Sequence, residues 1–387
     1  MGARMIDDRA KAPAATERTP APSAADDHYR VMVVDDSSVV RGIITKSLEA
    51  DPAIRVVASC PNGAVAVRML PSTPVDVIVL DIEMPEMDGM TALPRLLEIS
   101  PGVKIIMVSS LTRRNAEISL RALSLGAADY LPKPATGLGS ADQFRLELVT
   151  KVKAYAARAP RGRQVRPTTV PSAAQPARTQ APARPVVLRK AAIDRPSVIA
   201  IGSSTGGPQA LAEVLKSIGP GVTQPIVITQ HMPPTFTAIL AEHMTRYAGR
   251  NAAEAVDGEL LQPGRIYVAP GGFHMVMEPG ASGTVVRLSD APPENSCRPA
   301  VDPMLRSLSA IYRQKLLVVI LTGMGYDGLK GAKVAVEAGA ALIAQDQASS
   351  VVWGMPGAVA QAGICNAVLP LSEIGKAIGR IARGEAL

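Results

Sequence analysis

Short apolar runs that alternate with segments of helix length are the feature that most limits the possible folds of this chain. Five such runs occur between Tyr29 and about Arg158, and five more follow Arg195. Strands that are separated by helices are typical of parallel sheets with helices on both faces. We therefore expect two α/β domains, each built on a doubly wound parallel sheet.

The expected elements can be placed by residue number. The first block has strand candidates at 30–36, 54–60, 75–81, 104–110 and 128–134. The second block has them at 197–202, 225–230, 265–270, 315–323 and 341–346, with helical patterns at 208–218, 235–248, 328–339 and 371–383. Two shorter runs, 274–278 and 284–289, suggest an antiparallel hairpin added to the second sheet.

Composition separates these blocks from two other segments. Residues 1–28 are rich in Ala, Pro and charged residues, and we expect a disordered tail. Residues 158–195 are rich in Pro, Ala and Arg, which is typical of an extended linker. The two domains would then span 29–157 and 196–387. Since Arg158 to Lys190 holds eight Lys or Arg and no acid, the linker accounts for the net charge of +7.

Several functional classes are disfavoured by this composition. A basic linker is not a nucleic-acid-binding face, and aromatic residues make up only 3% of the chain, so we expect no nucleic-acid partner. The three cysteines have no metal-ligand spacing. No apolar run reaches the length of a membrane span, and the N-terminus has no signal-peptide core. We therefore expect a cytoplasmic protein without direct membrane insertion.

Acidic residues follow two strands of the first block. Asp35 and Asp36 end the first strand and Asp81 ends the third, which brings all three to the carboxyl edge of the predicted sheet. Carboxylates that meet there repel one another unless a cation joins them, and a hard ion such as Mg²⁺ suits oxygen ligands. Ser109 and Lys133, at the ends of the fourth and fifth strands, add a hydroxyl and a positive charge.

This order of groups at successive strand ends resembles the response-regulator receiver domain over residues 29–150. Such a domain is flavodoxin-like, and the resemblance implies that Asp81 accepts a phosphoryl group from a histidine kinase. It also implies roles for the neighbouring groups. Mg²⁺ would bind Asp36, Asp81 and the backbone carbonyl of Glu83 directly and Asp35 through water, while Ser109 and Lys133 would contact the phosphoryl group. The alternative is that the acids are helix caps or a solvated rim.

The second block opens with a Gly-rich turn, Gly202-Ser203-Ser204-Thr205-Gly206, between a strand and a helix. A dinucleotide-binding turn needs Gly where Ser204 stands, and an acid at the end of the next strand, which instead reads Gln230-His231. A Walker A loop would need a Gly-Lys pair. The pattern G-x-S-x-G favours a serine nucleophile, Ser204, raised on a sharp turn.

A serine nucleophile needs a base and a group that orients the base. The chain has four histidines, of which His28 lies in the tail, His243 reads as a surface residue and His274 as a structural one. His231 ends the strand that follows the serine turn, although it could instead cap a helix. Asp327 also follows an apolar strand, where it could orient His231, cap a helix, or do both.

Six motifs in the second block carry a further resemblance. They are IGSSTGG, TQHMPP, APGGFHM, RPAVDPM, LTGMGYDG and GMPGAV. Together they resemble the catalytic domain of the chemotaxis protein-glutamate methylesterase family, over residues 196–384, with a Rossmann-like fold. One departure is Ser203, where the family usually has Ala. The order of receiver, linker and esterase is also that of the family.

The resemblance implies a phosphorylation-regulated enzyme that demethylates glutamate esters on chemoreceptors and deamidates receptor glutamines. Ser204 would attack the ester, His231 would move the proton and Asp327 would orient the imidazole. The oxyanion would be held by the backbone of Met324, which the family implies, and of Thr205, which the turn suggests. The esterase reaction would need no cofactor. The alternative functions are a receiver with a DNA-binding or a non-catalytic scaffold domain.

Overall fold

The computed structural model describes residues 28–133, 138–159, 187–189, 194–219 and 221–385. The predicted N-terminal tail, apart from His28, lies outside the described residues, and so does most of the predicted linker. Among the described residues, no helix is both long and apolar enough to cross a membrane.

The first domain is a five-stranded parallel sheet in the order β2-β1-β3-β4-β5. Its strands are β1 (Tyr29–Val34), β2 (Ile54–Cys60), β3 (Val77–Asp81), β4 (Lys104–Ser109) and β5 (Asp129–Pro132). The helices are α1 (Ser38–Glu49), α2 (Gly63–Met69), α3 (Gly89–Ile99), α4 (Arg113–Ser124) and α5 (Leu138–Ala156), with a short 3₁₀ turn, η1 (Leu70–Ser72). This strand order is flavodoxin-like, so the first predicted fold is confirmed.

The second domain is a seven-stranded parallel sheet in the order β14-β13-β12-β6-β7-β9-β8. Its strands are β6 (Val198–Ser203), β7 (Ile226–Gln230), β8 (Ala252–Glu254), β9 (Ile266–Val268), β12 (Leu316–Ile320), β13 (Ala341–Gln345) and β14 (Ala367–Leu369). The helices are α6 (Gly207–Ser217), α7 (Phe236–Ala248), α8 (Val301–Tyr312), α9 (Leu329–Glu337), α10 (Met355–Gln361) and α11 (Leu371–Ala382), with a 3₁₀ turn, η2 (Arg313–Lys315). The doubly wound prediction is confirmed here too.

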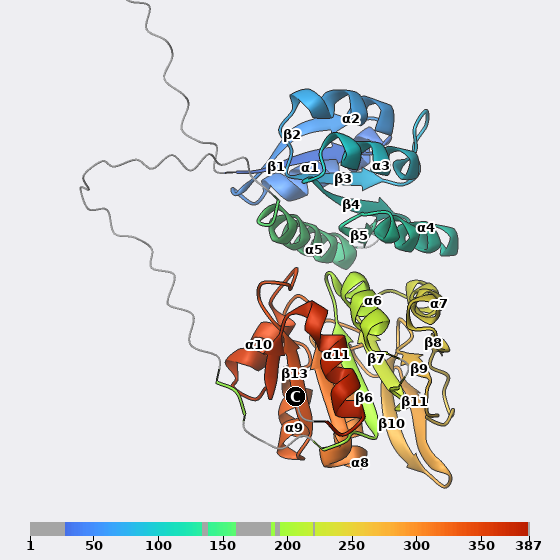
Figure 1. Cartoon of the computed structure of the whole chain (residues 1–387). Helices are drawn as coiled ribbons and strands as arrows, with labels where there is room; N and C mark the ends of the chain where they lie inside the picture. The colour runs from blue at the N-terminus through green and yellow to red at the C-terminus, as the bar shows by residue number, and fades with distance from the viewer. Residues whose placement is uncertain (1–27, 134–137, 160–186, 190–193, 220, 386–387) are drawn as a thin grey trace, which may run out of the picture.

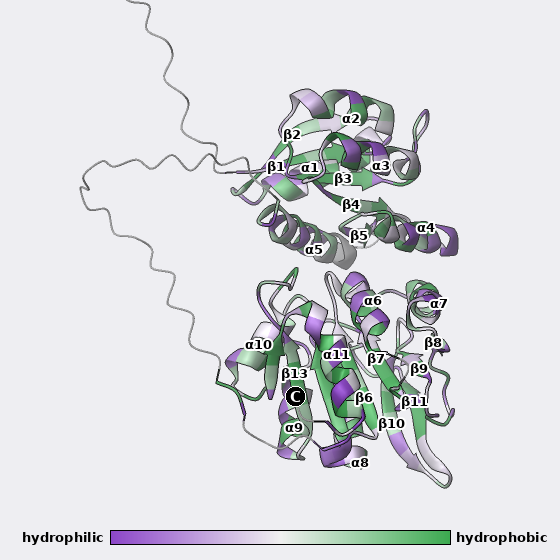
Figure 2. Cartoon of the chain, viewed as in Figure 1, coloured by the Kyte–Doolittle hydropathy of each residue, from purple (hydrophilic) through white to green (hydrophobic). Residues whose placement is uncertain are grey.

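Burial explains why these runs form central strands. All residues of β3, β6, β7, β12 and β13 are buried, which is the pattern of a parallel sheet covered on both faces. In the second domain α6 packs against α7 and α11, whereas α8 packs against α9. Figure 2 shows the apolar strands at the centre of each domain and polar residues on the outer helices.

The predicted hairpin is present as β10 (His274–Gly280) and β11 (Gly283–Ser289). The expectation that it is added to the second sheet is wrong, because it forms a separate two-stranded antiparallel sheet. It lies against α8. The sequence pattern does not predict β8 and β14, because strands of three residues are too short to show a period.

The two domains contact each other through a ring stack and hydrogen bonds. In Figure 1 helices α4 and α5 of the first domain face α6 and α7 of the second. The ring of Tyr130 in β5 stacks on that of Phe236 in α7, with their centroids 4.9 Å apart. Gln209 of α6 donates a hydrogen bond from Nε2 to the Ala128 carbonyl at 2.9 Å. Arg158, after α5, donates to the Ala348 carbonyl at 3.1 Å.

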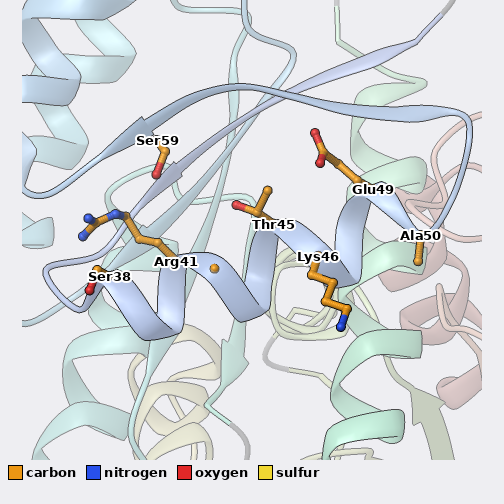
Figure 3. A pocket seen from close by; sticks show the side chains of 8 residues that line it. Ser38, Arg41, Thr45, Lys46, Glu49, Ala50 and Ser59 are labelled. Carbon is orange, nitrogen blue, oxygen red and sulfur yellow. The ribbon is translucent and has the colours of Figure 1, made fainter.

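A hollow of about 730 Å³ runs along α1 beside Ser59 of β2 (Figure 3). It is lined mainly by polar and charged side chains, including Arg41, Lys46 and Glu49. None of the predicted site residues lines it.

Candidate active site

The predicted nucleophile lies on the turn between β6 and α6, at the carboxyl edge of the sheet. Gly206 has φ 76°, in the left-handed region that glycine adopts without penalty. Gly207 has no room for a side chain, because a Cβ there would lie 1.9 Å from Oε1 of Gln230. The glycines of the pattern therefore allow the sharp turn that carries Ser204.

The structure distinguishes the two adjacent serines. Ser203 is fully buried, and its Oγ donates a hydrogen bond to Oε1 of Gln230 at 2.7 Å. Nε2 of Gln230 in turn donates to the Ser204 carbonyl at 3.0 Å. Ser204 itself is half-buried and lines a cleft. The side chain of Ser203 thus points into the core, and Ser204 is the serine that lines the cleft.

The predicted base and its orienter are in direct contact. His231 directly follows β7, and its Nε2 lies 2.8 Å from Oδ2 of Asp327. The second ring nitrogen, Nδ1, lies 3.3 Å from Sγ of Cys297. Because Nε2 is engaged by Asp327, a proton from a nucleophile would have to pass to Nδ1, which in this structure contacts Cys297. Among the described residues the Ser204 side chain has no hydrogen-bond partner, and the serine shares the cleft with His231.

The pKa values of this pair follow from their mutual contact. Burial disfavours the imidazolium, but hydrogen bonds to Asp327 and Cys297 outweigh it and raise the pKa of His231 to about 10. Burial also disfavours the carboxylate of Asp327, yet the bond to His231 and the Val301 N–H lower its pKa. The pair therefore favours a charged imidazolium beside a charged carboxylate.

The two predicted oxyanion donors lie beside the nucleophile. Thr205 and Met324 both line the cleft that contains Ser204. Within the described part of the chain, neither backbone N–H donates to a protein acceptor. Both N–H groups are thus free of other protein partners and available for a substrate oxygen.

The cleft itself has a volume of about 630 Å³ and lies between the two domains. The wall on the side of the second domain contains the serine turn, His231, Met324 and Asp327. Its other wall comes from the first domain, with Leu146, Glu147 and Lys151 of α5. The first domain therefore covers the mouth of the site in this structure.

The predicted carboxylate cluster of the first domain is also assembled. Oxygen atoms of Asp35, Asp36 and Asp81 lie within 4.8 Å of one another. Nζ of Lys133 lies 2.9 Å from Oδ2 of Asp35 and 2.8 Å from Oδ2 of Asp81. Burial, opposed by Lys133, raises the pKa of Asp81 to about 6. Three converging carboxylates fit a hard divalent cation such as Mg²⁺.

Two further residues complete this region. Glu83 lies two residues past Asp81 in the loop after β3, and its side chain is exposed. Ser109 is buried, and its Oγ lies 3.0 Å from Oγ of Ser119 in α4. In this structure the Ser109 hydroxyl is therefore bonded to α4.

The other histidines can now be compared with their predicted roles. His274 is buried, with Nε2 3.1 Å from the Pro292 carbonyl and Nδ1 accepting from Ala300 N–H at 3.2 Å, so the structural role is confirmed. The prediction that His243 is a surface residue is wrong, because its side chain is only 8% exposed. It lies on α7, which packs against α4 of the other domain.

Three residues of the site were missed by the sequence analysis. Gln230 braces the serine turn, Cys297 contacts the base, and Asn295 donates to Oδ1 of Asp327 at 2.8 Å. Asn295 and Cys297 come from a loop between the hairpin and α8, far in sequence from the triad. Of these three residues, only Gln230 could have been found from the sequence, because it is a polar residue at the end of an apolar strand.

Comparisons with known proteins agree with this geometry. Residues 199–378 match the family described as CheB methylesterase, and residues 31–138 match the response regulator receiver domain. The protein-glutamate methylesterase/protein-glutamine glutaminase of Azospirillum brasilense is 58% identical over 383 residues, covering 96% of this chain and 97% of that protein. The chain belongs to this methylesterase family. A relative of the same name from Paramagnetospirillum magneticum is 55% identical, covering 93% of this chain and 98% of its own length.

Two solved structures match the separate domains of this family member. The CheB methylesterase catalytic domain of Thermotoga maritima is 39% identical, with a TM-score of 0.46, and covers 47% of this chain and 97% of its own. The response regulator domain of the same organism's CheB is 36% identical, with a TM-score of 0.31, and covers 34% of this chain and 97% of its own.

Proposed function

We propose that this chain is a serine hydrolase that removes methyl groups from glutamate esters of chemoreceptors and deamidates receptor glutamines. The observation that carries the proposal is the contact between His231 and Asp327 in the cleft that also contains Ser204. A base that is oriented by a carboxylate beside an accessible serine is the arrangement of acyl-transfer enzymes.

In the proposed reaction Ser204 Oγ attacks the carbonyl carbon of the methyl ester. The proton of the hydroxyl passes to Nδ1 of His231, since Nε2 is held by Asp327. The oxygen of the tetrahedral intermediate accepts hydrogen bonds from the N–H groups of Thr205 and Met324. The imidazolium then protonates the leaving methoxide, which departs as methanol.

The second half of the reaction regenerates the enzyme. Water loses a proton to His231 and attacks the acyl-enzyme, and Ser204 leaves with that proton. The product is a glutamate carboxylate. A primary amide passes through the same kind of tetrahedral intermediate and releases ammonia, so the same residues would convert glutamine to glutamate.

For the first domain we propose phosphorylation of Asp81 by a histidine kinase. The carboxylates of Asp35, Asp36 and Asp81, with the Glu83 carbonyl, would hold Mg²⁺, which shields the charge of the incoming phosphoryl group. Lys133 would pair with the phosphoryl group, and the hydroxyl of Ser109 would leave Ser119 to reach it. Kinase, receptor and enzyme would meet in the cytoplasm. The limits of the two domains, 29–157 and 196–387, and of the linker, 158–195, also remain proposals.

The test of the proposed mechanism separates the two serines. Ser204→Ala is expected to lower the rate of methanol release from methylated receptor by roughly 10⁴- to 10⁶-fold, because it removes the nucleophile. Ser203→Ala removes only a buried hydrogen bond and is expected to retain most of the activity. The mechanism fails if Ser204→Ala is active, and the assignment is reversed if Ser203→Ala is the inactive variant.

A further inference from the structure

The carboxylate that orients the base has a second buried carboxyl beside it. Asp302, at the start of α8, is fully buried, and Asp327 is only 2% exposed. Burial raises the pKa of Asp302, and the charge of Asp327 adds to this effect. Two neighbouring buried carboxyls repel each other when both are ionised, so donors between them decide how they are arranged.

Asn295 supplies a donor to both carboxyls. Its Nδ2 lies 2.8 Å from Oδ1 of Asp327 and 3.0 Å from Oδ2 of Asp302. An amide NH₂ carries two protons, so one nitrogen can satisfy both acceptors. The amide of Asn295 therefore joins two groups that would otherwise repel.

The orientation of this amide is set by a tight turn. The turn is closed by hydrogen bonds from Glu294 N–H to the Cys297 carbonyl at 3.1 Å and back at 2.9 Å. Its two central residues, Asn295 and Ser296, have φ of 51° and 64°, which is typical of a type I′ turn and is tolerated well by Asn. Arg306 of α8 anchors the turn through the Glu294 carboxylate, at 2.5 and 3.0 Å.

The remaining contacts of Asp327 show what Asn295 contributes. Oδ2 is held twice, by Nε2 of His231 and by the Val301 N–H at 2.6 Å. Oδ1 is held by Asn295 and, at the longer distance of 3.2 Å, by the Asp302 N–H. Without the amide, Oδ1 would keep only the longer of these two bonds, and the carboxylate would be less fixed against rotation.

We propose that Asn295 is a positioning residue of the esterase, which holds the Asp327 carboxylate for His231 by tying it to Asp302. The inference rests on the proposed catalytic role of His231 and Asp327. Asn295 does not touch the reacting atoms. It acts through Asp327, so its loss lowers the rate of the chemical step without weakening the binding of the receptor.

Two substitutions in the full-length protein separate the amide from the turn. Asn295→Gly keeps the positive φ and removes the amide. It is expected to lower kcat by about 10- to 100-fold, by analogy with the loss of groups that orient the ligands of a metal site. KM is expected to stay within about twofold. Ser296→Gly, a change at the other centre of the same turn, is the control and is expected to keep kcat within about twofold.

Asn295→Asp provides a readout that a purely structural role would not give. Asp also tolerates a positive φ, but its carboxyl can donate only while it is protonated. The ratio of its kcat to that of the unaltered protein is therefore expected to fall as pH rises through the titration of this third carboxyl. For Asn295→Gly the same ratio is expected to stay constant with pH.

The activity of Ser204→Ala distinguishes failure of this inference from failure of the proposed mechanism. The inference is overturned if both Asn295 variants keep kcat within about twofold, or if only KM changes, while Ser204→Ala is inactive. If Ser204→Ala is itself active, the mechanism fails instead. Thermal melts identify a variant that does not fold. If Asn295→Asp does not fold, the kcat of Asn295→Gly tests the inference, because glycine adopts the positive φ of this turn readily.

Discussion

At the scale of single residues, His231 is surrounded by groups that stabilise its protonated ring. Burial lowers the pKa of this imidazole, but the contacts with Asp327 and Cys297 together outweigh burial and raise it. A general base works only when it is neutral, so kcat/KM is governed by the fraction of enzyme in which His231 has lost its proton. The same carboxylate that orients the ring thus sets the pH range in which the enzyme acts.

We predict that kcat/KM for ester hydrolysis rises with pH on a limb whose apparent pKa lies above 6.5, the ordinary value for His. In Asp327→Asn this limb moves to lower pH, because the charge that stabilised the imidazolium is gone. The plateau rate also falls, since the amide no longer fixes the ring. The measurement is the pH profile of methanol release for both proteins. A limb that does not move, or that moves to higher pH, would contradict the role given to Asp327.

At the scale of elements, the turn between β6 and α6 depends on glycine for two separate reasons. Gly206 has a positive φ, and a Cβ at this position would lie 2.6 Å from Cγ2 of Val351. Gly249, at the end of α7, has φ 61° and nothing within 4 Å of such a Cβ. The two glycines share the left-handed backbone conformation and differ in the space around them.

We predict that Gly206→Ala loses most of the esterase activity, because the added methyl group displaces the turn that carries Ser204. Gly249→Ala is the matched control. It bears the same penalty for a positive φ, about 1–2 kcal/mol, and is expected to keep its activity. Initial rates and thermal melts of both variants provide the comparison. Equal losses of activity would show that backbone strain alone explains the effect.

At the scale of the whole molecule, the first domain covers the cleft of the second. Leu146 and Glu147 of α5 line one side of the cleft, opposite the triad. The contact includes the Tyr130–Phe236 stack and the Gln209–Ala128 hydrogen bond. β5, which carries Tyr130, leads directly to Lys133, the partner of Asp81. Lys133, which pairs with Asp81, is therefore close in sequence to Tyr130 at the domain contact.

We predict that this contact inhibits the unphosphorylated enzyme by blocking a helical substrate. Residues 191–387 alone are expected to hydrolyse receptor esters faster than the full chain. Gln209→Glu in the full chain is expected to raise the rate as well, because a carboxylate would face the Ala128 carbonyl. Asp81→Asn is expected to abolish stimulation by a small phosphodonor with Mg²⁺. If the fragment and the full chain have equal rates, the inhibition model is wrong, and recruitment of the enzyme to the receptor is the better explanation for the first domain.

The sequence by itself determined both folds and the candidate residues of both sites. Fully apolar strands alternate with helices, and this local pattern is enough to indicate parallel sheets. Ser204, His231, Asp35, Asp36 and Asp81 were found because they lie at or directly after the ends of such strands, and Asp327 because it lies in the loop after β12. The ends of parallel strands share one edge of the sheet. The choice of Ser204 over Ser203 came from the centre of the G-x-S-x-G pattern.

Only the tertiary structure decided which groups surround these residues. Cys297 and Asn295 reach the triad from a turn whose position depends on how the hairpin and α8 pack, and nothing in the local sequence encodes that packing. The prediction for His243 was wrong because the pattern of one helix does not reveal that another domain packs against it. Here α4 of the first domain packs against α7, which carries His243. Contacts between distant segments arise from the burial of apolar surface, which is a property of the folded chain and not of any one segment.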